Sequence, residues 1–323
     1  MKIVVTGGSG FVGKRLEKIR PDWIYLSSKD YDLVSTEDCK RMYRELCPDA
    51  VLHMAGKVGG IGANDANPAE FYYLNTMINT NIVHQGYLHG VKRILATLST
   101  CTFPDIVESY PLTENDILSG PPANTNLSYG YAKRSLYIQI NSYRKQYGVN
   151  YSTFCPSNIY GPGDNFDSLS SHFVAALIAK IAKAKDGDTI ELWGTGTPLR
   201  QQLYVDDLCE IIPMLLEKHN GDEPLIIAPN ENLSIDEMAR ILLSQVHKNI
   251  EIVYNNNLDG QFRKDGSNHK LKESIGDFKF TKFKDGITKT YDWYIENKET
   301  ARNKRHHSLP ALPDKMALIW QTY

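Results

Sequence analysis

Short apolar runs alternate with longer amphipathic stretches over roughly the first 160 residues of the chain. The apolar runs lie at residues 2–6, 23–28, 50–55 and 93–99. Two longer stretches, residues 69–88 and about 130–147, have helical spacing and are long enough to cross a sheet. This alternation predicts βαβ units built around a parallel sheet.

The pattern loosens after residue 162. A predicted strand at 151–162 ends in Pro and Gly residues, which indicates that the first sheet is nearly complete there. We expect a helix at about 171–184, strands around 189–194 and 202–206, helices around 206–218 and 234–246, and a strand at 251–255. These shorter mixed elements predict a smaller second region. The last twenty or so residues, including His306 and His307, are more typical of a solvated or docking tail than of a metal site.

Charge and cysteine content narrow the function classes. In 323 residues, 36 Lys and Arg face 38 Asp and Glu, for a formal net charge of −2. A chain so balanced has no global positive field for nucleic acid, and any anion site must be local. The five cysteines are odd in number, scattered and free of CxxC spacing, which argues against a disulfide framework or a structural metal site. We expect a reducing, cytoplasmic location. Apolar runs stay short of the roughly 18 residues of a membrane span, so we expect no membrane partner.

A glycine-rich turn follows the first predicted strand and opens a helix. Gly7 allows a sharp turn, Gly10 lets backbone N–H groups approach a pyrophosphate, and Gly13 lets the helix pack close to the strand. The helix N-terminus adds partial positive charge. Glycines also occur in ordinary turns, but this placement between strand and helix favours a dinucleotide site. We expect contacts from Gly7, Gly8, Ser9, Gly10, Phe11, Val12 and Gly13.

The end of the second strand bears on the choice between NAD and NADP. An NAD-selective site usually places a carboxylate there to bind the ribose 2′-OH. Here the strand ends in Ser27, Ser28 and Lys29, which suit a 2′-phosphate. Asp30 follows directly and weakens the inference, and a lysine in an exposed loop is a competing interpretation of Lys29. NADPH is the favoured cofactor.

Tyr129 and Lys133 lie four residues apart in a helical stretch and so share one face. We expect the lysine ammonium to lower the pKa of the Tyr129 phenol and make it a proton donor. Ser99 ends the strand at 93–99, where ligands of parallel sheets bind, and its hydroxyl could hold a substrate carbonyl. A YxxxK pair alone often occurs by chance on an exposed helix. Together with the glycine turn and Ser99, the pair favours hydride transfer.

These residues resemble the extended short-chain dehydrogenase/reductase family. The matching segments lie at residues 6–14, 57–61, 98–105, 120–134, 156–166, 170–177, 192–201 and 259–265. The resemblance extends to about residue 298. It implies an α/β fold, with a doubly wound parallel-sheet Rossmann domain and a smaller α/β substrate-binding domain. The domains would span 1–165, with about 200–220 returning to the first, then 166–302, followed by a C-terminal tail at 303–323.

Within that family the segments are similar to those of enzymes that act on GDP-4-keto-6-deoxy-D-mannose. The resemblance implies an NADP-dependent oxidoreductase that also epimerises C3 and C5 of the sugar before reducing its 4-keto group. Cys101 matches the family's base and His172 its acid. Taken alone, Cys101 could be a small buried hydrophobe and His172 a helix cap.

The resemblance also implies further site residues and a partner. Cofactor contacts would come from Lys29, Asp32, Leu33, Lys133, Pro156, Ser157, Asn158, Ile159 and His172. Contacts to the GDP-sugar would come from Lys180, Trp193, Arg200, Asp259 and Lys264. The family usually forms homodimers through the two long helices. We interpret Asp206 and Asp207 as an N-cap with no catalytic role.

Three alternatives stay open. A colitose-pathway enzyme would use nearly the same residues on a 3-deoxy sugar and epimerise only C5. A pure nucleotide-sugar 4-epimerase is disfavoured because Lys29 replaces its usual acidic residue. A dinucleotide-sensing regulatory protein could keep the glycine turn, but it should lack the set of Ser99, Tyr129 and Lys133.

Overall fold

A parallel sheet forms the centre of the N-terminal part in the computed structural model, which describes residues 1–167, 171–246, 248–256 and 261–301. Its strand order is β10-β5-β4-β3-β1-β2, and each neighbouring pair is parallel. The strands are β1 (Ile3–Thr6), β2 (Ile24–Leu26), β3 (Ala50–His53), β4 (Arg93–Thr97), β5 (Asn150–Pro156) and β10 (Leu225–Ile227). The chain builds outward in one direction to β2 and then in the other from β3, so the order reverses between β1 and β3. The predicted doubly wound fold is confirmed.

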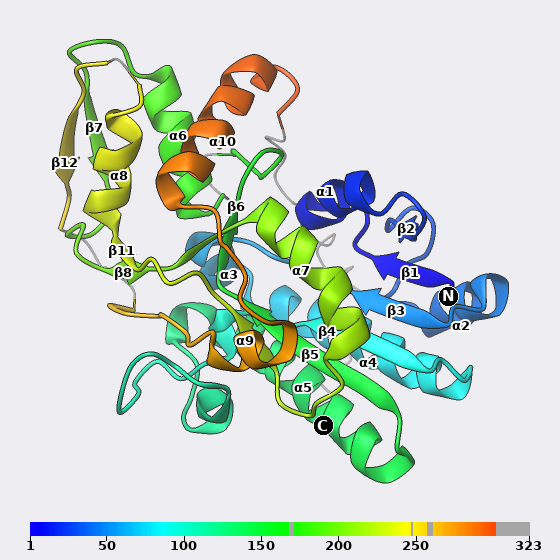
Figure 1. Ribbon diagram of the computed structural model, residues 1–323. Helices are drawn as coiled ribbons and strands as arrows, with labels where there is room; N and C mark the ends of the chain where they lie inside the picture. The colour runs from blue at the N-terminus through cyan, green and yellow to red at the C-terminus, as the bar shows by residue number, and fades with distance from the viewer. Residues whose placement is uncertain (168–170, 247, 257–260, 302–323) are drawn as a thin grey trace, which may run out of the picture.

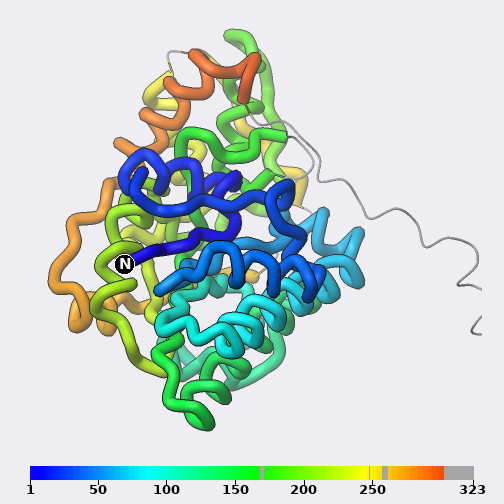
Figure 2. The backbone as a smooth tube through the Cα atoms, turned by 90° about the vertical axis from the view of Figure 1, so that its right-hand side faces the viewer, coloured from blue at the N-terminus to red at the C-terminus, as the bar shows by residue number. Residues whose placement is uncertain are grey.

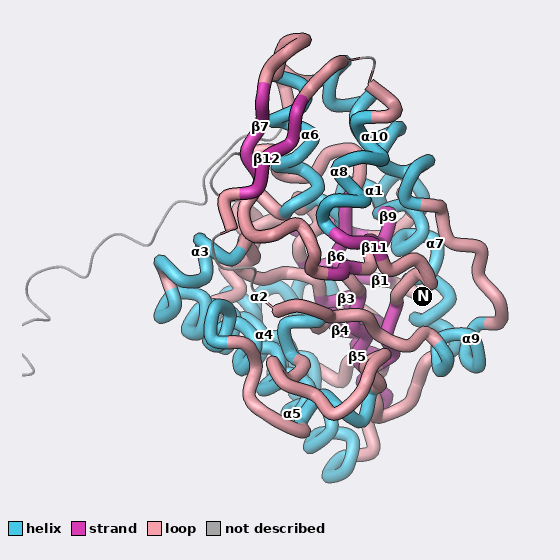
Figure 3. Tube along the Cα trace, turned by 90° about the vertical axis from the view of Figure 1, so that its left-hand side faces the viewer, coloured by secondary structure: helices cyan, strands magenta, loops and turns pink. Residues whose placement is uncertain are grey.

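Both faces of this sheet are covered by helices. Val4 packs into the core on one face, while its neighbours Ile3 and Val5 pack into the core on the other. One core includes residues of α2 (Thr36–Leu46), α4 (Pro68–Leu88) and α5 (Leu127–Tyr147). The opposite core includes residues of α1 (Phe11–Ile19), α7 (Val205–Lys218) and α9 (His269–Ile275). Figure 3 shows the two sets of helices on either side of the strands. Burial on both faces explains why the strands are apolar throughout rather than alternating.

The sixth strand, β10, returns to the sheet late in the chain, and the sequence pattern did not predict it. Its three residues pair with Phe154, Cys155 and Pro156 of β5. A three-residue apolar run is too short to stand out by periodicity, and its pairing partner lies some seventy residues earlier. In Figure 2 the yellow-green helix α7 and the orange segment with α9 lie against the N-terminal part, which accords with the contacts of α7 to α1 and α9.

A second group of elements has its own core. Strands β7 (Thr189–Leu192) and β12 (Glu251–Tyr254) form a parallel pair. They pack with α6 (Phe173–Lys183), α8 (Ile235–Leu243) and α10 (Phe283–Asn297), whose apolar faces share one buried cluster. This group is at the upper left of Figure 1, away from the main sheet. The domain boundary at 165–166 stays a prediction, and the tail at 303–323 lies outside the described residues.

Short elements connect the two groups. Strand β6 (Asn158–Tyr160) pairs with β9 (Gln202–Tyr204), and β8 (Leu199–Arg200) pairs with β11 (Leu233–Ser234). Helix α3 (Ile61–Ala66) and three 3₁₀ turns, η1 (Thr100–Thr102), η2 (Glu114–Leu118) and η3 (Asn124–Asn126), complete the fold. None of the helices in the described ranges is long and apolar enough to cross a membrane.

The N-cap interpretation of Asp206 and Asp207 is wrong. Helix α7 is capped by Tyr204, so both aspartates lie in its first turn. Arg15 of α1 donates two hydrogen bonds of 2.8 and 2.6 Å to the Asp206 carboxylate. Asp207 accepts hydrogen bonds of 2.7 Å from the backbone and the hydroxyl of Thr281. The two carboxylates therefore join α7 to α1 and to the segment before α10. Their negative charge also interacts favourably with the partial positive charge at the start of α7.

Candidate active site

A cavity of about 690 Å³ lies at the carboxyl edge of the main sheet. Its walls come from the turns that follow β1, β2, β3, β4 and β5, together with residues of α4 and α5. Ligands of doubly wound sheets bind at this edge, beside the point where the strand order reverses. The cavity is therefore where the predicted cofactor should lie.

The glycine turn after β1 supplies one wall of the cavity. Gly7 has a φ of +77°, which a residue with a side chain adopts only with strain. A Cβ at Gly13 would lie 2.5 Å from the carbonyl oxygens of Gly7 and Gly8, so this position requires glycine for α1 to pack on the turn. Gly10 caps α1 without a described side-chain cap, and the first turn contains no acidic residue. The N–H groups at the start of α1 are thus suited to a pyrophosphate.

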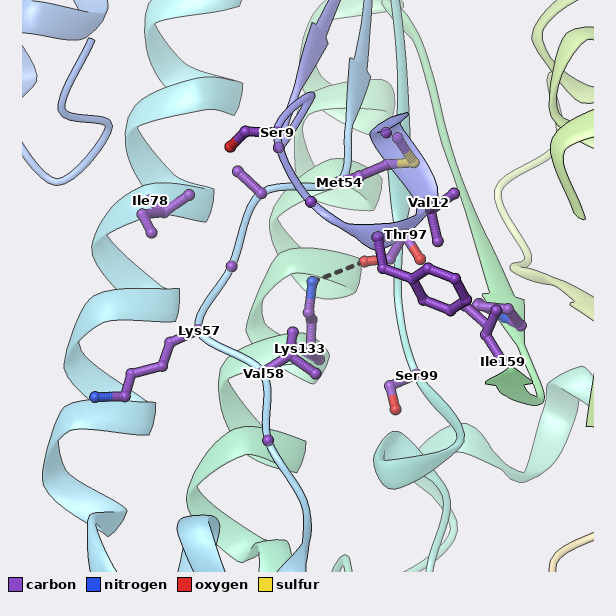
Figure 4. A pocket seen from close by; sticks show the side chains of 18 of the residues that line it. Ser9, Val12, Met54, Lys57, Val58, Ile78, Thr97, Ser99, Lys133 and Ile159 are labelled. Atoms are coloured by element: carbon purple, nitrogen blue, oxygen red, sulfur yellow. Dashed lines mark hydrogen bonds between the residues drawn. The ribbon is translucent and has the colours of Figure 1, made fainter. Parts of the chain in front are cut away.

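Ser99, Tyr129 and Lys133 all line the cavity. The Lys133 ammonium donates a 3.0 Å hydrogen bond to the Thr97 carbonyl at the end of β4, which Figure 4 draws as a dashed line with Ser99 on the loop beyond. Its Nζ lies 6.0 Å from the centroid of the Tyr129 ring. Both side chains are almost fully buried, with 2% of Lys133 and 6% of Tyr129 exposed. The structure brings the predicted set together.

Burial decides the protonation of these groups. It raises the pKa of Tyr129 above its ordinary value, and a side-chain hydrogen bond with Ser99 offsets this only in part. We expected Lys133 to lower that pKa; the net direction is the opposite, because burial disfavours the tyrosinate. The same burial lowers the pKa of Lys133 to about 8. Tyr129 is therefore a neutral phenol, which has a proton to give.

A buried polar chain supports this wall, and sequence reasoning did not single it out. Thr6 Oγ1 lies 2.8 Å from Nδ1 of His53, and Nε2 of His53 lies 3.0 Å from Oδ1 of Asn79. Asn79 Nδ2 then donates to the Ala132 carbonyl at 3.3 Å, beside Lys133. Burial lowers the pKa of His53 to about 3, so this histidine stays neutral. The chain connects β1, β3, α4 and α5 at the catalytic end of the sheet.

Cys101 lies in the η1 turn just beyond Ser99. Its backbone N–H donates to Ser99 Oγ at 3.2 Å, and the Lys264 ammonium donates to its Sγ at 3.8 Å. A Cβ at Gly130 would lie 2.5 Å from the Cys101 carbonyl, so this glycine lets α5 approach the turn. The side chain is partly exposed, unlike Cys39, Cys155 and Cys209, which are buried. The interpretation of Cys101 as a buried hydrophobe is wrong.

His172 is the N-cap residue of α6 and lines the cavity. Its side chain makes no capping hydrogen bond within the described residues, so the cap interpretation does not hold. The residue is exposed toward the cavity, although the surrounding protein still lowers the pKa of its imidazole below the ordinary value through desolvation. Desolvation therefore favours the neutral imidazole, and His172 must take a proton from solvent before it can give one to a ligand.

The expected cofactor contacts fall mostly on the cavity wall. Lining residues include Ser9, Asp32, Leu33, Pro156, Ser157, Asn158 and Ile159. The Ser157 hydroxyl is buried without a hydrogen-bond partner among the described residues, as expected of a group that awaits a polar ligand. Together with the open start of α1, this orphaned hydroxyl fits a dinucleotide.

The end of β2 is arranged differently from a carboxylate site for ribose. The Asp30 carboxylate accepts hydrogen bonds of 2.7 Å from both the N–H and the hydroxyl of Ser27. Lys29 is exposed and is not among the described residues that line the cavity, whereas its neighbours Ser27 and Ser28 are. Sequence reasoning missed Arg41, whose guanidinium lies 4.4 Å over the ring of Tyr31, a lining residue.

Of the residues expected to bind the GDP-sugar, the structure describes Lys180, Trp193, Arg200 and Lys264, and none of these four lines this cavity. Lys180 donates a 2.7 Å hydrogen bond to the Glu191 carbonyl, and Arg200 donates one of the same length to the Leu199 carbonyl. The Trp193 side chain is 74% exposed. Asp259 lies outside the described residues. Their roles stay predictions.

Sequence reasoning missed one complete wall of the cavity. It consists of Met54, Ala55, Gly56, Lys57, Val58 and Gly59 after β3, with Leu74 and Ile78 of α4. Figure 4 shows Met54, Lys57, Val58 and Ile78 in this part of the cavity. The end of the third predicted strand could have indicated this wall, because the carboxyl ends of parallel strands lie at the same edge of a sheet. The described residues contain no group of three or more His, Cys, Asp or Glu side chains that could hold a metal ion.

Comparison with known proteins places these observations in a family. A family model described as the NAD dependent epimerase/dehydratase family matches residues 3–228. The GDP-L-fucose synthase of Dictyostelium discoideum is 35% identical over 93% of this chain and 97% of its own length. The probable GDP-L-fucose synthase of Drosophila melanogaster is 33% identical over 93% and 99%. A crystal structure of a GDP-L-fucose synthetase from Naegleria fowleri bound to NADP has a TM-score of 0.85 and 34% identity, covering 93% of this chain and 94% of that one.

Proposed function

We propose a function from one premise: this chain belongs to the NAD dependent epimerase/dehydratase family and, within it, to the GDP-L-fucose synthases. It is an NADP-dependent oxidoreductase with epimerase activity. It epimerises GDP-4-keto-6-deoxy-D-mannose at C3 and C5 and reduces the 4-keto group, giving GDP-L-fucose. The observation that carries this proposal is the convergence of Ser99, Tyr129, Lys133 and His172 on the cavity whose glycine turn fits a dinucleotide.

NADPH, when bound, supplies the hydride for C4 of the sugar. The start of α1 after Gly10 would hold its pyrophosphate, and Ser157 would use its unpaired hydroxyl. Lys133 would hold the nicotinamide ribose. Ser99 would bind the C4 oxygen, and Tyr129, as a neutral phenol, would give its proton to that oxygen.

Epimerisation precedes reduction in the same site. The 4-keto group acidifies the hydrogens at C3 and C5. The Cys101 thiolate takes a proton from one face of the sugar, and His172 returns a proton to the opposite face. Ser99 and Tyr129 stabilise the negative charge on the C4 oxygen between these two transfers. The same hydroxyls thus serve both reactions, and the sugar need not leave between them.

Lys180, Trp193, Arg200, Asp259 and Lys264 are the proposed contacts to the nucleotide sugar. Arg200 suits a diphosphate because its planar guanidinium can bind two oxygens. Trp193 offers an exposed flat surface beside the second group of elements. The positions of Lys180, Trp193 and Arg200 outside the cofactor cavity suit a substrate that extends away from the nicotinamide end.

We also propose a homodimer formed through α4 and α5. These helices pack against each other and carry exposed apolar side chains, including Tyr72 (46% exposed), Leu88 (57%) and Ile138 (51%). The described residues of the second group leave these side chains uncovered. Ile138→Lys should shift the protein from dimer to monomer in sedimentation velocity, whereas the wild type sedimenting as a monomer would contradict the proposal.

The decisive experiment supplies the protein with NADPH and GDP-4-keto-6-deoxy-D-mannose and identifies the product by NMR. We expect GDP-L-fucose and one NADPH consumed per product. Absence of NADPH consumption, or formation of the C4 alcohol without epimerisation, would contradict the proposal. The matched test for a colitose-pathway enzyme uses the 3-deoxy-4-keto sugar. If that substrate has the higher kcat/KM and is inverted only at C5, the alternative replaces the proposal.

A further inference from the structure

The Cys101 thiol accepts a hydrogen bond from the ammonium of Lys264. The distance from Nζ to Sγ is 3.8 Å, and both side chains are partly exposed. The two residues are 163 positions apart in the chain. Spacing in the sequence could not have paired them, and the family resemblance implies a different role for Lys264, as a cation for the nucleotide.

The backbone on either side of Lys264 is held in place. Arg263 forms an ion pair with the buried Asp265, and the Arg263 carbonyl accepts a 2.9 Å hydrogen bond from the hydroxyl of Tyr110. On the other side, the N–H of Gly266 donates to Gln201 Oε1 at 2.8 Å. Lys264 is therefore presented to Cys101 from a fixed segment rather than from a freely moving loop.

The thiol is held from its own side as well. Ser99 Oγ accepts from the Cys101 N–H, and Arg134 Nε donates to the next carbonyl, that of Thr102, at 2.6 Å. Tyr129 of α5 and Cys155 of β5 are titratable groups that interact electrostatically with Cys101. Burial raises the pKa of both, so both are neutral at physiological pH. Lys264 and the nearby guanidinium of Arg134 thus make the surroundings of the thiol positive.

We infer that Lys264 is a positioning residue for epimerisation, whose ammonium keeps Cys101 as a thiolate aimed at the sugar. This inference rests on the proposed function for the role of Cys101 as the base. The thiolate takes the proton from carbon and becomes a thiol, and the electron pair passes to the C4 oxygen. His172, protonated beforehand from solvent, gives that proton to the other face of the same carbon as the electron pair returns from the C4 oxygen. The thiol then loses its proton to water, and His172 takes up another from solvent. A lysine near a cysteine generally favours the thiolate.

The test measures the thiol directly and requires no substrate. The rate of Cys101 alkylation by iodoacetamide, followed by mass spectrometry, depends on the thiolate fraction and so gives a midpoint pH. In Lys264→Met this midpoint should rise by about one pH unit, which makes Cys101 about tenfold less reactive at neutral pH. Lys264→Arg should restore a midpoint close to that of the wild type. Cys47, which is exposed and 54 residues away, is the internal reference, and Lys185→Met is the matched surface control.

An unchanged midpoint in Lys264→Met, with a raised KM for the GDP-sugar, would overturn the inference and leave Lys264 as a substrate contact. If Lys264→Met fails to fold, the alkylation midpoint is measured in Lys264→Gln and in the wild type instead. The wild-type midpoint must then lie below that of the same thiol in urea-unfolded protein, and a midpoint at or above it overturns the inference. Alkylation needs neither NADPH nor sugar, so it tests the contact between Lys264 and Cys101 separately from the proposed function. A shifted midpoint in a protein that makes no GDP-L-fucose would support this contact and contradict the proposed function.

Discussion

The groups proposed for hydride transfer and those proposed for epimerisation lie in different surroundings, although Ser99 connects them. Tyr129 and Lys133 are almost fully buried on α5. Cys101 is partly exposed on the η1 turn, and His172 is exposed toward the cavity at the start of α6. The first pair comes from one helix, whereas the second comes from segments about seventy residues apart.

This difference corresponds to what each reaction requires. Proton donation to the C4 oxygen needs a phenol that keeps its proton, and burial ensures this by raising the pKa of Tyr129. Epimerisation needs a base and an acid that recover their protonation states after each cycle, and contact with solvent allows that. Neighbouring segments can therefore supply two acid–base systems with different access to water.

The largest expected effect comes from Tyr129→Phe, which removes the buried proton donor. Reduction, measured as NADPH consumption, should fall by about 10²–10⁴-fold. Solvent-deuterium incorporation at C3 and C5, measured by NMR, should fall less than reduction does, because Cys101 and His172 remain and Ser99 still stabilises the charge on the C4 oxygen. Binding of NADPH, measured by fluorescence, serves as the folding control. Equal loss of both activities would break the division between the buried and the exposed pair.

Cys101→Ser should have the complementary effect. Deuterium incorporation at C3 and C5 should drop by about 10²–10³-fold, since a serine hydroxyl ionises far less readily than a thiol. Direct reduction of the unepimerised 4-keto sugar should then accumulate its C4 alcohol, which NMR distinguishes from GDP-L-fucose. Cys47→Ser is the matched control, because Cys47 is exposed and is not among the residues that line the cavity. Normal deuterium exchange in the Cys101 variant would remove this thiol from the mechanism.

The pH dependence of the buried pair sharpens the comparison further. Burial lowers the pKa of Lys133 to about 8, so its ammonium is present below that pH and is lost as the pH rises through it. The kcat/KM for NADPH should therefore fall about tenfold per pH unit above about 8. In Lys133→Arg the guanidinium keeps its charge, and the profile should stay flat over this interval at a lower overall rate. A wild-type profile that is flat from about pH 7 to 9.5 would contradict the role of Lys133.

The smallest effect is expected at the rim of the cofactor site. Lys29→Ala should reduce the preference for NADPH over NADH by about fivefold, since an exposed cation contributes about 1 kcal/mol to a phosphate contact. The ratio of the two kcat/KM values is the measurement. Lys92→Ala, at an exposed lysine just before β4, is the control. An unchanged ratio would direct attention to Ser27, Ser28 or Arg41 as the residues that bind the 2′-phosphate.

The sequence was most informative where function depends on local backbone geometry. The turn from Gly7 to Gly13 could be predicted because its requirements, a positive φ and close helix packing, are specific to glycine. Tyr129 and Lys133 could be paired because four residues make one helical turn. The predicted long helices correspond to α4 and α5, with starts one to three residues earlier in the structure.

Prediction failed where the outcome depended on three-dimensional surroundings. The direction of the Tyr129 pKa shift follows from burial, which residue spacing does not reveal. The contact between Lys264 and Cys101 joins segments that no periodicity connects. Asp206 and Asp207 suited an N-cap by residue type, yet their partners, Arg15 and Thr281, belong to other elements.

The late return of β10 to the sheet has a consequence for how the protein is made. During synthesis, β5 is complete at Pro156, but its outer edge has no partner until Ile227 has left the ribosome. Until then the nascent chain carries an unpaired, apolar strand edge, the kind of surface that recruits chaperones or joins another chain. A fragment that ended after β5 would lack the edge strand β10 of the main sheet. The ribosome must therefore translate α6 and β7 of the second group before the main sheet can receive its last strand.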